Sequence, residues 1–242
     1  MKIKILGSAP GLPTLGKSNS LIWLRIADKN VLLDCGEGAS QRLLQNNLIK
    51  DSIDLVLISH LHPDHVSGIF MMIQMFYLQG RTKPLNIYLP ERVKDFAALL
   101  EMFYTFADRL TYKVNFLPIE NANKECCALT LIDSDHLISY KDVISKYNIP
   151  NTMQAYSFLF TENNKRFIYS ADISDTKKIE PYLDNTDLLV VDAFHVTAKE
   201  IIALPQKTKG RIILNHGLSD ELKKIIDSLE FELADEETGI IL

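Results

Sequence analysis

Short apolar runs recur along the whole chain and alternate with stretches of helical periodicity. Residues 55–58 are four consecutive apolar residues, a pattern typical of a strand that is buried on both faces. The same reasoning predicts strands at 2–6, 20–26, 31–34, 85–89, 114–117, 128–132, 156–160, 167–169, 188–191 and 212–214. Apolar residues at helical spacing predict a helix from Val66 that ends near Gly80, and further helices at 39–47, 92–106, 175–183, 198–204 and 220–229.

This number of strands with interspersed helices favours two sheets, or one large sheet, flanked by helices. The chain has no solenoid repeat, no low-complexity tract and no linker that would mark a domain boundary. We therefore expect one α/β domain over residues 1–242, a length that buries an ample core. With 24% charged and 47% hydrophobic residues, the composition excludes disordered, collagen-like and coiled-coil proteins.

The charge and the cysteines narrow the class of protein further. The net charge of −5 gives no general attraction to nucleic acids or anionic membranes, so nucleic-acid binding would need a local basic patch. The three cysteines, at 35, 126 and 127, form neither a disulfide framework nor a C-x-x-C pair. The N-terminus does not resemble a signal peptide, and the most apolar stretch, 68–78, is too short to span a membrane. These features predict a cytoplasmic protein with no membrane partner.

Many of the predicted strands are followed by a polar residue of a metal-ligating type. The residues in these positions are His60, His136, Asp172, His195 and His216. Loops at one edge of a sheet bring residues that are distant in sequence together. We therefore expect these five side chains to gather at one site.

The densest part of this pattern is HLHPDH at residues 60–65, with three imidazoles and one carboxylate. Such density suits two adjacent divalent cations, with zinc first and manganese or iron as alternatives. Water held between two cations loses a proton near neutral pH and becomes a hydroxide nucleophile. The alternative is a few surface histidines beside a turn, and His136 taken alone would more often be a capping or core histidine.

The H-x-H-x-D-H motif resembles the metallo-β-lactamase superfamily, and this resemblance implies a four-layer αββα sandwich. The segment LGSAPGLPTLGKSNSLIWL, followed by LLDCGEGASQRLL, is similar to the start of ribonuclease Z and its phosphodiesterase relatives. The similarity continues in SDH at 134–136, AYSFLF at 155–160, YSADIS at 169–174, HVTAKEI at 195–201 and LNHGLS at 214–219.

The resemblance implies a role for each matching residue. One metal would be bound by His60, His62 and His136, the other by Asp64, His65 and His216, with Asp172 bridging the two. Asp64 also counts among the expected catalytic residues. His195 would protonate the leaving oxygen, and Asp192 would orient it. Asp34 would fix the metal histidines by accepting their second N–H.

For several of these residues, interpretations without a role in metal binding or catalysis stay open. His195 could begin a helix without any chemical role, Asp192 could be a capping or loop residue, and Asp34 could be a turn residue before glycine. Gly7, Gly36 and Gly38 are better explained by turn geometry than by close approach to a phosphate. Cys35 is expected to be a small buried residue rather than a ligand.

The chain departs from the ribonuclease Z pattern in its RNA-binding parts. Bacterial ribonuclease Z inserts a long flexible arm after the third metal motif, whereas residues 156–169 here predict two strands joined by a turn at 161–165. The extra residues lie at 137–154 instead. The family's HFS-x-R-Y becomes HGLSDE from His216, and Ser18 stands where an arginine is expected.

The leading hypothesis is a dinuclear metal-dependent hydrolase of a phosphodiester in a small, cyclic or nucleotide substrate. A ribonuclease Z-type tRNA 3′-processing endonuclease is the main alternative, and hydrolysis of an ester, thioester or lactam also stays open. A metal-binding or regulatory module without catalysis is disfavoured by the intact donor set. We expect a small-molecule partner rather than a nucleic acid, and a homodimer could assemble a basic surface from Lys124, Lys141 and Lys146.

Overall fold

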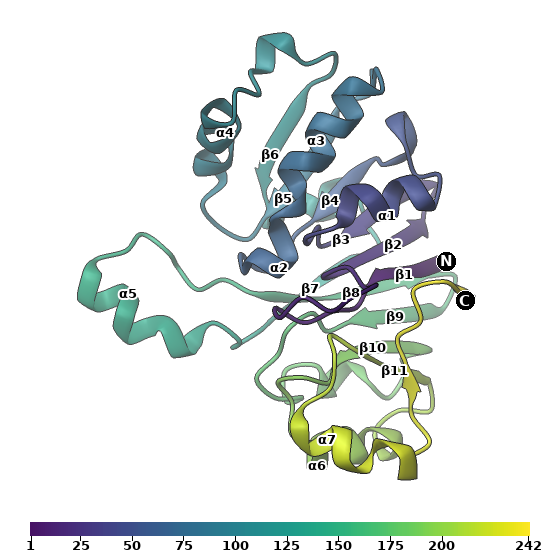
Figure 1. Ribbon diagram of the computed structural model, residues 1–242. Coiled ribbons are helices and arrows are strands. Elements are labelled where there is room, and N and C mark those ends of the chain that lie inside the picture. Colours follow the sequence, from purple (N-terminus) through teal and green to yellow (C-terminus); the bar gives the residue numbers. More distant parts are fainter.

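The computed structural model describes residues 1–242, and its strands form two sheets that lie face to face (Figure 1). The first sheet has the order β13-β1-β2-β3-β4-β5-β6 and the second the order β12-β11-β10-β9-β8-β7. The strands of the first sheet are β1 (Lys2–Gly7), β2 (Leu21–Ile26), β3 (Lys29–Leu33), β4 (Leu55–Leu57), β5 (Leu85–Leu89), β6 (Val114–Pro118) and β13 (Gly239–Ile241). Those of the second are β7 (Leu129–Asp133), β8 (Tyr156–Glu162), β9 (Lys165–Tyr169), β10 (Leu188–Asp192), β11 (Arg211–Asn215) and β12 (Glu232–Leu233).

Helices cover the outer face of each sheet and complete the αββα sandwich that the family resemblance implies (Figure 1). The first sheet is covered by α1 (Ala39–Gln45), α3 (Gly68–Leu78) and α4 (Val93–Met102), and the short α2 (Pro63–Val66) lies at its edge. The second sheet is covered by α6 (Ala198–Ala203) and α7 (Asp220–Ile225). The remaining helix, α5 (Lys141–Tyr147), projects away from the sandwich.

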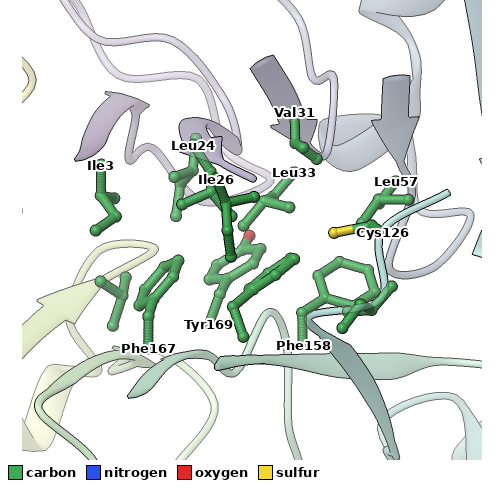
Figure 2. Close-up of a cluster of buried hydrophobic side chains, with 14 of the residues drawn as sticks. Ile3, Leu24, Ile26, Val31, Leu33, Leu57, Cys126, Phe158, Phe167 and Tyr169 are labelled. Carbon is green, nitrogen blue, oxygen red and sulfur yellow. The ribbon is translucent and has the colours of Figure 1, made fainter. Parts of the chain in front are cut away.

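The inner faces of the two sheets share one hydrophobic core. Figure 2 shows Leu24 and Leu33 of the first sheet opposite Phe158, Phe167 and Tyr169 of the second. These side chains are inaccessible or almost inaccessible to solvent. Burial of their apolar surface holds the sheets together, so the strand ends are fixed relative to one another.

Each sheet combines antiparallel and parallel pairing. Strands β1, β2 and β3 pair antiparallel, and β3 to β6 pair parallel; β7, β8 and β9 pair antiparallel, and β9 to β12 pair parallel. Parallel neighbours end at the same edge of a sheet, so the loops after β4, β9, β10 and β11 can converge.

The helix predicted at 175–183 is wrong, because only one 3₁₀ turn, Glu180–Tyr182, forms in this stretch. Pro181 lacks a backbone N–H and disfavours helical geometry in the residue before it, which limits helix growth here. The helix predicted at 92–106 is shorter, because the left-handed residues Arg92 (φ 57°) and Tyr104 (φ 57°) flank it. The helix α7 also ends early and continues as a 3₁₀ turn at Ile226–Ser228.

The elements that were not predicted from the sequence include α2, α5, β12 and β13. The helix α5 has no side-chain cap at its N-terminus and ends at Asn148 in the left-handed conformation. The strand β13 pairs with β1, and the backbone N–H of Leu242 donates to the carbonyl of Met1, so the two termini lie side by side (Figure 1).

The hairpin predicted within 156–169 is confirmed. Strands β8 and β9 pair antiparallel and are joined by Asn163 (φ 52°) and Asn164 (φ 61°), whose left-handed backbone is typical of a two-residue hairpin turn. No arm can be accommodated in this two-residue connection. None of the helices is long and apolar enough to cross a membrane.

Candidate metal centre

The polar residues that follow the strands gather at one edge of the sandwich. His60 follows β4, His136 follows β7, Asp172 follows β9 and His216 follows β11. Together with the rest of the HLHPDH motif they form two groups of four donors, and Asp172 belongs to both. The predicted convergence of the strand ends is therefore present in the structure.

Pro63 divides the HLHPDH motif between the two groups. It occupies the first turn of α2, where its fixed φ is favourable and its missing N–H costs no hydrogen bond. His62 is still extended (φ −66°, ψ 145°), whereas Asp64 and His65 lie in the helical turn. The motif thus directs His60 and His62 to one group and Asp64 and His65 to the other.

The first group consists of His60, His62, His136 and Asp172. Nδ1 of His62 lies 3.0 Å from Nε2 of His60 and 3.2 Å from Nε2 of His136. Nε2 of His136 lies 3.5 Å from Oδ2 of Asp172. Four ligands about 2.1 Å from one tetrahedral ion are separated from each other by about 3.4 Å, so these spacings fit such an ion.

The second group consists of Asp64, His65, Asp172 and His216. Nε2 of His65 lies 3.1 Å from Oδ1 of Asp172 and 3.6 Å from Oδ2 of Asp64. Nε2 of His216 lies 3.5 Å from the same Asp64 oxygen. Oδ2 of Asp172, which faces His136 of the first group, also lies 3.3 Å from Nε2 of His216. Asp172 therefore lies between the two groups, as a bridging carboxylate requires.

Two further observations show that the residues fit a pair of divalent cations. Oδ1 of Asp172 is buried and makes no hydrogen bond of normal geometry, although Nε2 of His65 lies 3.1 Å away, and a bound cation would satisfy this oxygen. Burial lowers the pKa of His60 well below its usual value and that of His136 to about 4, so both imidazoles are neutral at pH 7. Neutral imidazole is the form that binds a metal.

Asp34 contacts His65, a member of the second group, and holds its ring in place. It is fully buried, and its Oδ2 lies 2.8 Å from Nδ1 of His65 and accepts a hydrogen bond from Oη of Tyr169 at 2.8 Å. Its Oδ1 accepts the backbone N–H of Ser59 at 2.7 Å. Burial opposes a charge on His65, but Asp172 and Asp34 outweigh it and raise the pKa of this imidazole. The position that the resemblance gave to Asp34 is therefore observed.

Two serines near the donors were missed in the sequence. Oγ of Ser20 lies 3.2 Å from Nδ1 of His216, and Oγ of Ser59 lies 3.0 Å from Nδ1 of His60. Both are fully buried and fix the far nitrogen of a donor imidazole. Ser59 directly precedes the motif, but nothing in the sequence pattern distinguishes Ser20 from other loop serines.

His195 lies beside both groups, and Asp192 holds its ring. Oδ2 of Asp192 lies 2.9 Å from Nδ1 of His195, whose ring is 4.7 Å from that of His136 and stacked at 5.6 Å on that of His216. Burial opposes protonation of His195, but the hydrogen bond and charge of Asp192 raise its pKa. With Nδ1 occupied, Nε2 is the nitrogen available to another molecule. The chemical roles of both residues stay predictions.

The glycines of this region differ in what they require. Gly38 has φ 83°, so turn geometry explains it. For Gly36 the prediction that turn geometry explains the glycine is wrong. A Cβ at this position would lie 2.1 Å from the backbone oxygen of Asp64, so the close approach of that backbone requires glycine. Gly7 is similar, since its Cβ would meet the backbone of Asn19. Cys35 is buried and its Sγ contacts Met72, so it is a packing residue as expected.

Comparison with known proteins identifies relatives of this chain. The family described as "Anti-Pycsar protein Apyc1" matches residues 1–237. The chain is 31% identical over 181 residues to ribonuclease Z of Bacteroides thetaiotaomicron, which covers 75% of this chain and 54% of that protein. The chain thus spans about half the length of such curated relatives.

Solved structures share the fold. Human tRNase Z, short form, superimposes with a TM-score of 0.73 at 20% identity, over 100% of this chain and 99% of that one. The metallo-β-lactamase fold protein YhfI of Bacillus subtilis gives a TM-score of 0.71 at 19% identity, over 99% and 98%. Together with the family match, these findings show that the chain belongs to the Anti-Pycsar protein Apyc1 family, in the ribonuclease Z-like branch of the metallo-β-lactamase superfamily.

Proposed function

We propose that this chain is a hydrolase that uses two divalent metal ions to cleave phosphodiester bonds in small substrates, in particular cyclic nucleotides. The observation that carries the proposal is the pair of four-donor groups that share Asp172. Their imidazole and carboxylate donors suit zinc first, with manganese or iron as alternatives. When bound, such a pair supplies a hydroxide at neutral pH and positive charge opposite a phosphate.

The protein's own residues set up this chemistry. Asp34, Ser59 and Ser20 hold the donor rings in fixed orientations through hydrogen bonds to their far nitrogens. The neutral imidazoles of His60 and His136 leave their nitrogens free for a cation. We also count Asp64 among the catalytic residues, as a ligand of the second metal. Its side chain is more accessible than that of Asp172, the other carboxylate of the group.

His195 is the candidate general acid. Asp192 occupies its Nδ1, so Nε2 is the atom that can donate a proton to the leaving oxygen of a bound phosphodiester. The backbone N–H groups of Phe194 and His195 also donate to Asp192, at 2.8 Å and 3.2 Å, and hold the carboxylate in place. A well-placed general acid contributes about 10²–10⁴-fold to the rate.

Two observations favour a small substrate over a large polyanion. The β8–β9 connection consists of Asn163 and Asn164, which leaves no arm at that point. The net charge is −5, whereas tight binding of RNA requires several cationic contacts to phosphates. Relatives named ribonuclease Z act, by that name, on RNA, and this supports phosphodiester chemistry rather than ester, thioester or lactam hydrolysis.

Those same relatives favour one second candidate, a tRNA 3′-processing endonuclease. In that case a homodimer would assemble a basic surface from Lys124, Lys141 and Lys146, of which Lys141 and Lys146 are exposed on the projecting α5. We also propose a cytoplasmic location, which the three free cysteines support.

A side-by-side kinetic comparison tests the proposal. Zinc- or manganese-loaded protein is assayed at physiological salt with 3′,5′-cyclic nucleotides, bis(p-nitrophenyl) phosphate, precursor tRNA and the lactam nitrocefin. We expect kcat/KM for cyclic nucleotides to match or exceed that for precursor tRNA, with no turnover of nitrocefin. Site-specific release of the tRNA 3′ trailer without turnover of small esters would establish the endonuclease instead.

A further inference from the structure

An apolar cavity of about 290 Å³ lies directly beside the metal centre. One wall is formed by Leu61 and His62, and another by Leu137 and Tyr140. Leu61 lies between two of the predicted ligands, and Leu137 follows His136 in sequence. The ring of Tyr140 meets that of His62 edge-on, with 5.6 Å between the ring centres. The cavity and the metal centre are therefore continuous through His62.

The outer wall of the cavity is formed by residues 137–154, the segment that is extra relative to the ribonuclease Z pattern. Val143 and Ile144 of α5 line it, together with Ile149. Val143 remains 48% exposed and Ile149 38% exposed, so much of their apolar surface is open to solvent. Exposed apolar surface beside a reaction centre is typical of a ligand-binding wall.

Hydrogen bonds attach this wall to the loop that follows β5. Nη1 of Arg92 donates to Oδ1 of Asn151 at 2.9 Å, and Oγ1 of Thr152 donates to Oε2 of Glu91 at 2.9 Å. The backbone N–H of Thr152 donates to the same Glu91 oxygen. The projecting segment is thereby held at its base, and the cavity is preformed.

Two polar groups in the lining have unused hydrogen-bonding capacity. Glu91 is buried and lines the cavity, and only its Oε2 accepts hydrogen bonds from the protein. Asn151 also lines it, and its side-chain amide accepts from Arg92 but its NH₂ group donates to no protein atom. An apolar cavity with a few such polar groups is the usual form of a small-molecule site.

We propose that this cavity, lined by Leu61, Tyr140 and Ile144, holds the nucleobase of a cyclic nucleotide whose phosphodiester lies at the metal centre. This inference rests on the proposed function and names the element that recognises the substrate. A base has apolar faces for the aliphatic and aromatic walls and a polar edge for Glu91 and Asn151. Because His62 belongs to both sites, one small molecule can reach both.

A substitution that fills the cavity tests the inference. In Ile144→Trp the larger side chain occupies the space of the base, and Tyr147→Trp is the matched control, because Tyr147 lies on the same helix, is 64% exposed and does not line the cavity. KM is measured for adenosine 3′,5′-cyclic phosphate and for ribose 3′,5′-cyclic phosphate, which lacks a base. We expect Ile144→Trp to raise the ratio of the first KM to the second by about tenfold or more. Tyr147→Trp should leave this ratio unchanged.

A binding measurement without catalysis separates this inference from the proposed function. Adenosine is titrated into the metal-free protein, and NMR shifts are followed at Tyr140, Ile144 and Ile149. We expect saturable shifts in the wild type that disappear in Ile144→Trp but not in Tyr147→Trp. If cyclic nucleotides are cleaved but the two variants behave alike, the cavity does not bind the base, although the proposed function stands. If adenosine binds here and no phosphodiester is cleaved, the proposed function fails. If adenosine does not bind and Ile144→Trp instead changes the oligomeric state, a second copy covers the cavity, and the inference is wrong.

Discussion

Nδ1 of His65 lies 2.8 Å from Oδ2 of Asp34, and neither side chain is exposed to solvent. The same carboxylate oxygen accepts a hydrogen bond from Tyr169, whose ring packs in the core between the sheets (Figure 2). The orientation of a predicted metal ligand is thus determined by the core itself. Asp34 has φ 60°, a conformation that aspartate and asparagine tolerate better than most residues.

Replacement of Asp34 tests this connection. Asp34→Asn preserves the size and the backbone conformation but places an amide where the carboxylate accepts its hydrogen bonds. We expect the affinity for the metal at the His65 group to fall by about 10–100-fold, the usual effect of losing such a support. Isothermal titration with zinc measures it. Tyr169→Phe is the control, because it removes one donor to Asp34 and keeps the contact with His65; a loss as large as that of Asp34→Asn would show that the effect is not specific to His65.

The role of His195 predicts a variant that keeps its metals but loses most of its rate. In His195→Ala we expect both metals to stay bound, since neither four-donor group includes this residue. Phosphodiester cleavage should slow by about 10²–10⁴-fold, the range of one general acid. Metal content and kcat are measured on the same preparation. A loss of metal like that caused by His216→Ala would mean that His195 is a ligand.

We expect the stability of the fold to depend on a buried arginine outside the two donor groups. Arg81 is fully buried, and its guanidinium donates to the carbonyls of Lys50, Ile53, Lys83 and Pro84. Arg81→Met leaves these acceptors without donors, so we expect a loss of roughly 3 kcal/mol or more. For a chain of this size that corresponds to a fall in Tm of about 6–12 °C.

Calorimetry on metal-free protein checks this prediction. Arg25→Met is the control, because the Arg25 side chain is 42% exposed and its ion pair with Asp28 has an N–O distance of 3.5 Å. Its Tm should stay within a degree or two of the wild type, since exposed ion pairs contribute little. Equal shifts in the two variants would show that the buried contacts of Arg81 do not stabilise the fold.

Local patterns predicted the strands, the flanking helices and the convergence of the strand ends, whereas the four-layer sandwich was implied by the resemblance to a family. The all-apolar residues 55–58 correspond to β4. The ligand-type residues after β9 and β11 meet because parallel strands of one sheet end at the same edge, and the face-to-face packing of the sheets brings the end of β4 to them. The assignment of individual ligands depended on the resemblance to a family. That residues 1–242 form one domain, and that each residue has its assigned role, stay predictions.

What the sequence did not predict depends on contacts between distant residues. Ser20 fixes His216 across almost the whole chain, and no local pattern marks such a pair. Gly36 is required by the backbone of Asp64 rather than by its own turn. The helix α5 is held by contacts at its base, between Arg92 and Asn151, rather than by a cap in its own sequence.

The metal content of the purified protein is the most direct test of the central claim. Elemental analysis should give two equivalents of a divalent cation per chain, and anomalous diffraction should place them at the two groups that share Asp172. His60→Ala should lose the first equivalent and His216→Ala the second, each without turnover. No bound cation at these residues after exposure to zinc or manganese, or a single cation that Asp172→Ala leaves in place, would contradict the account.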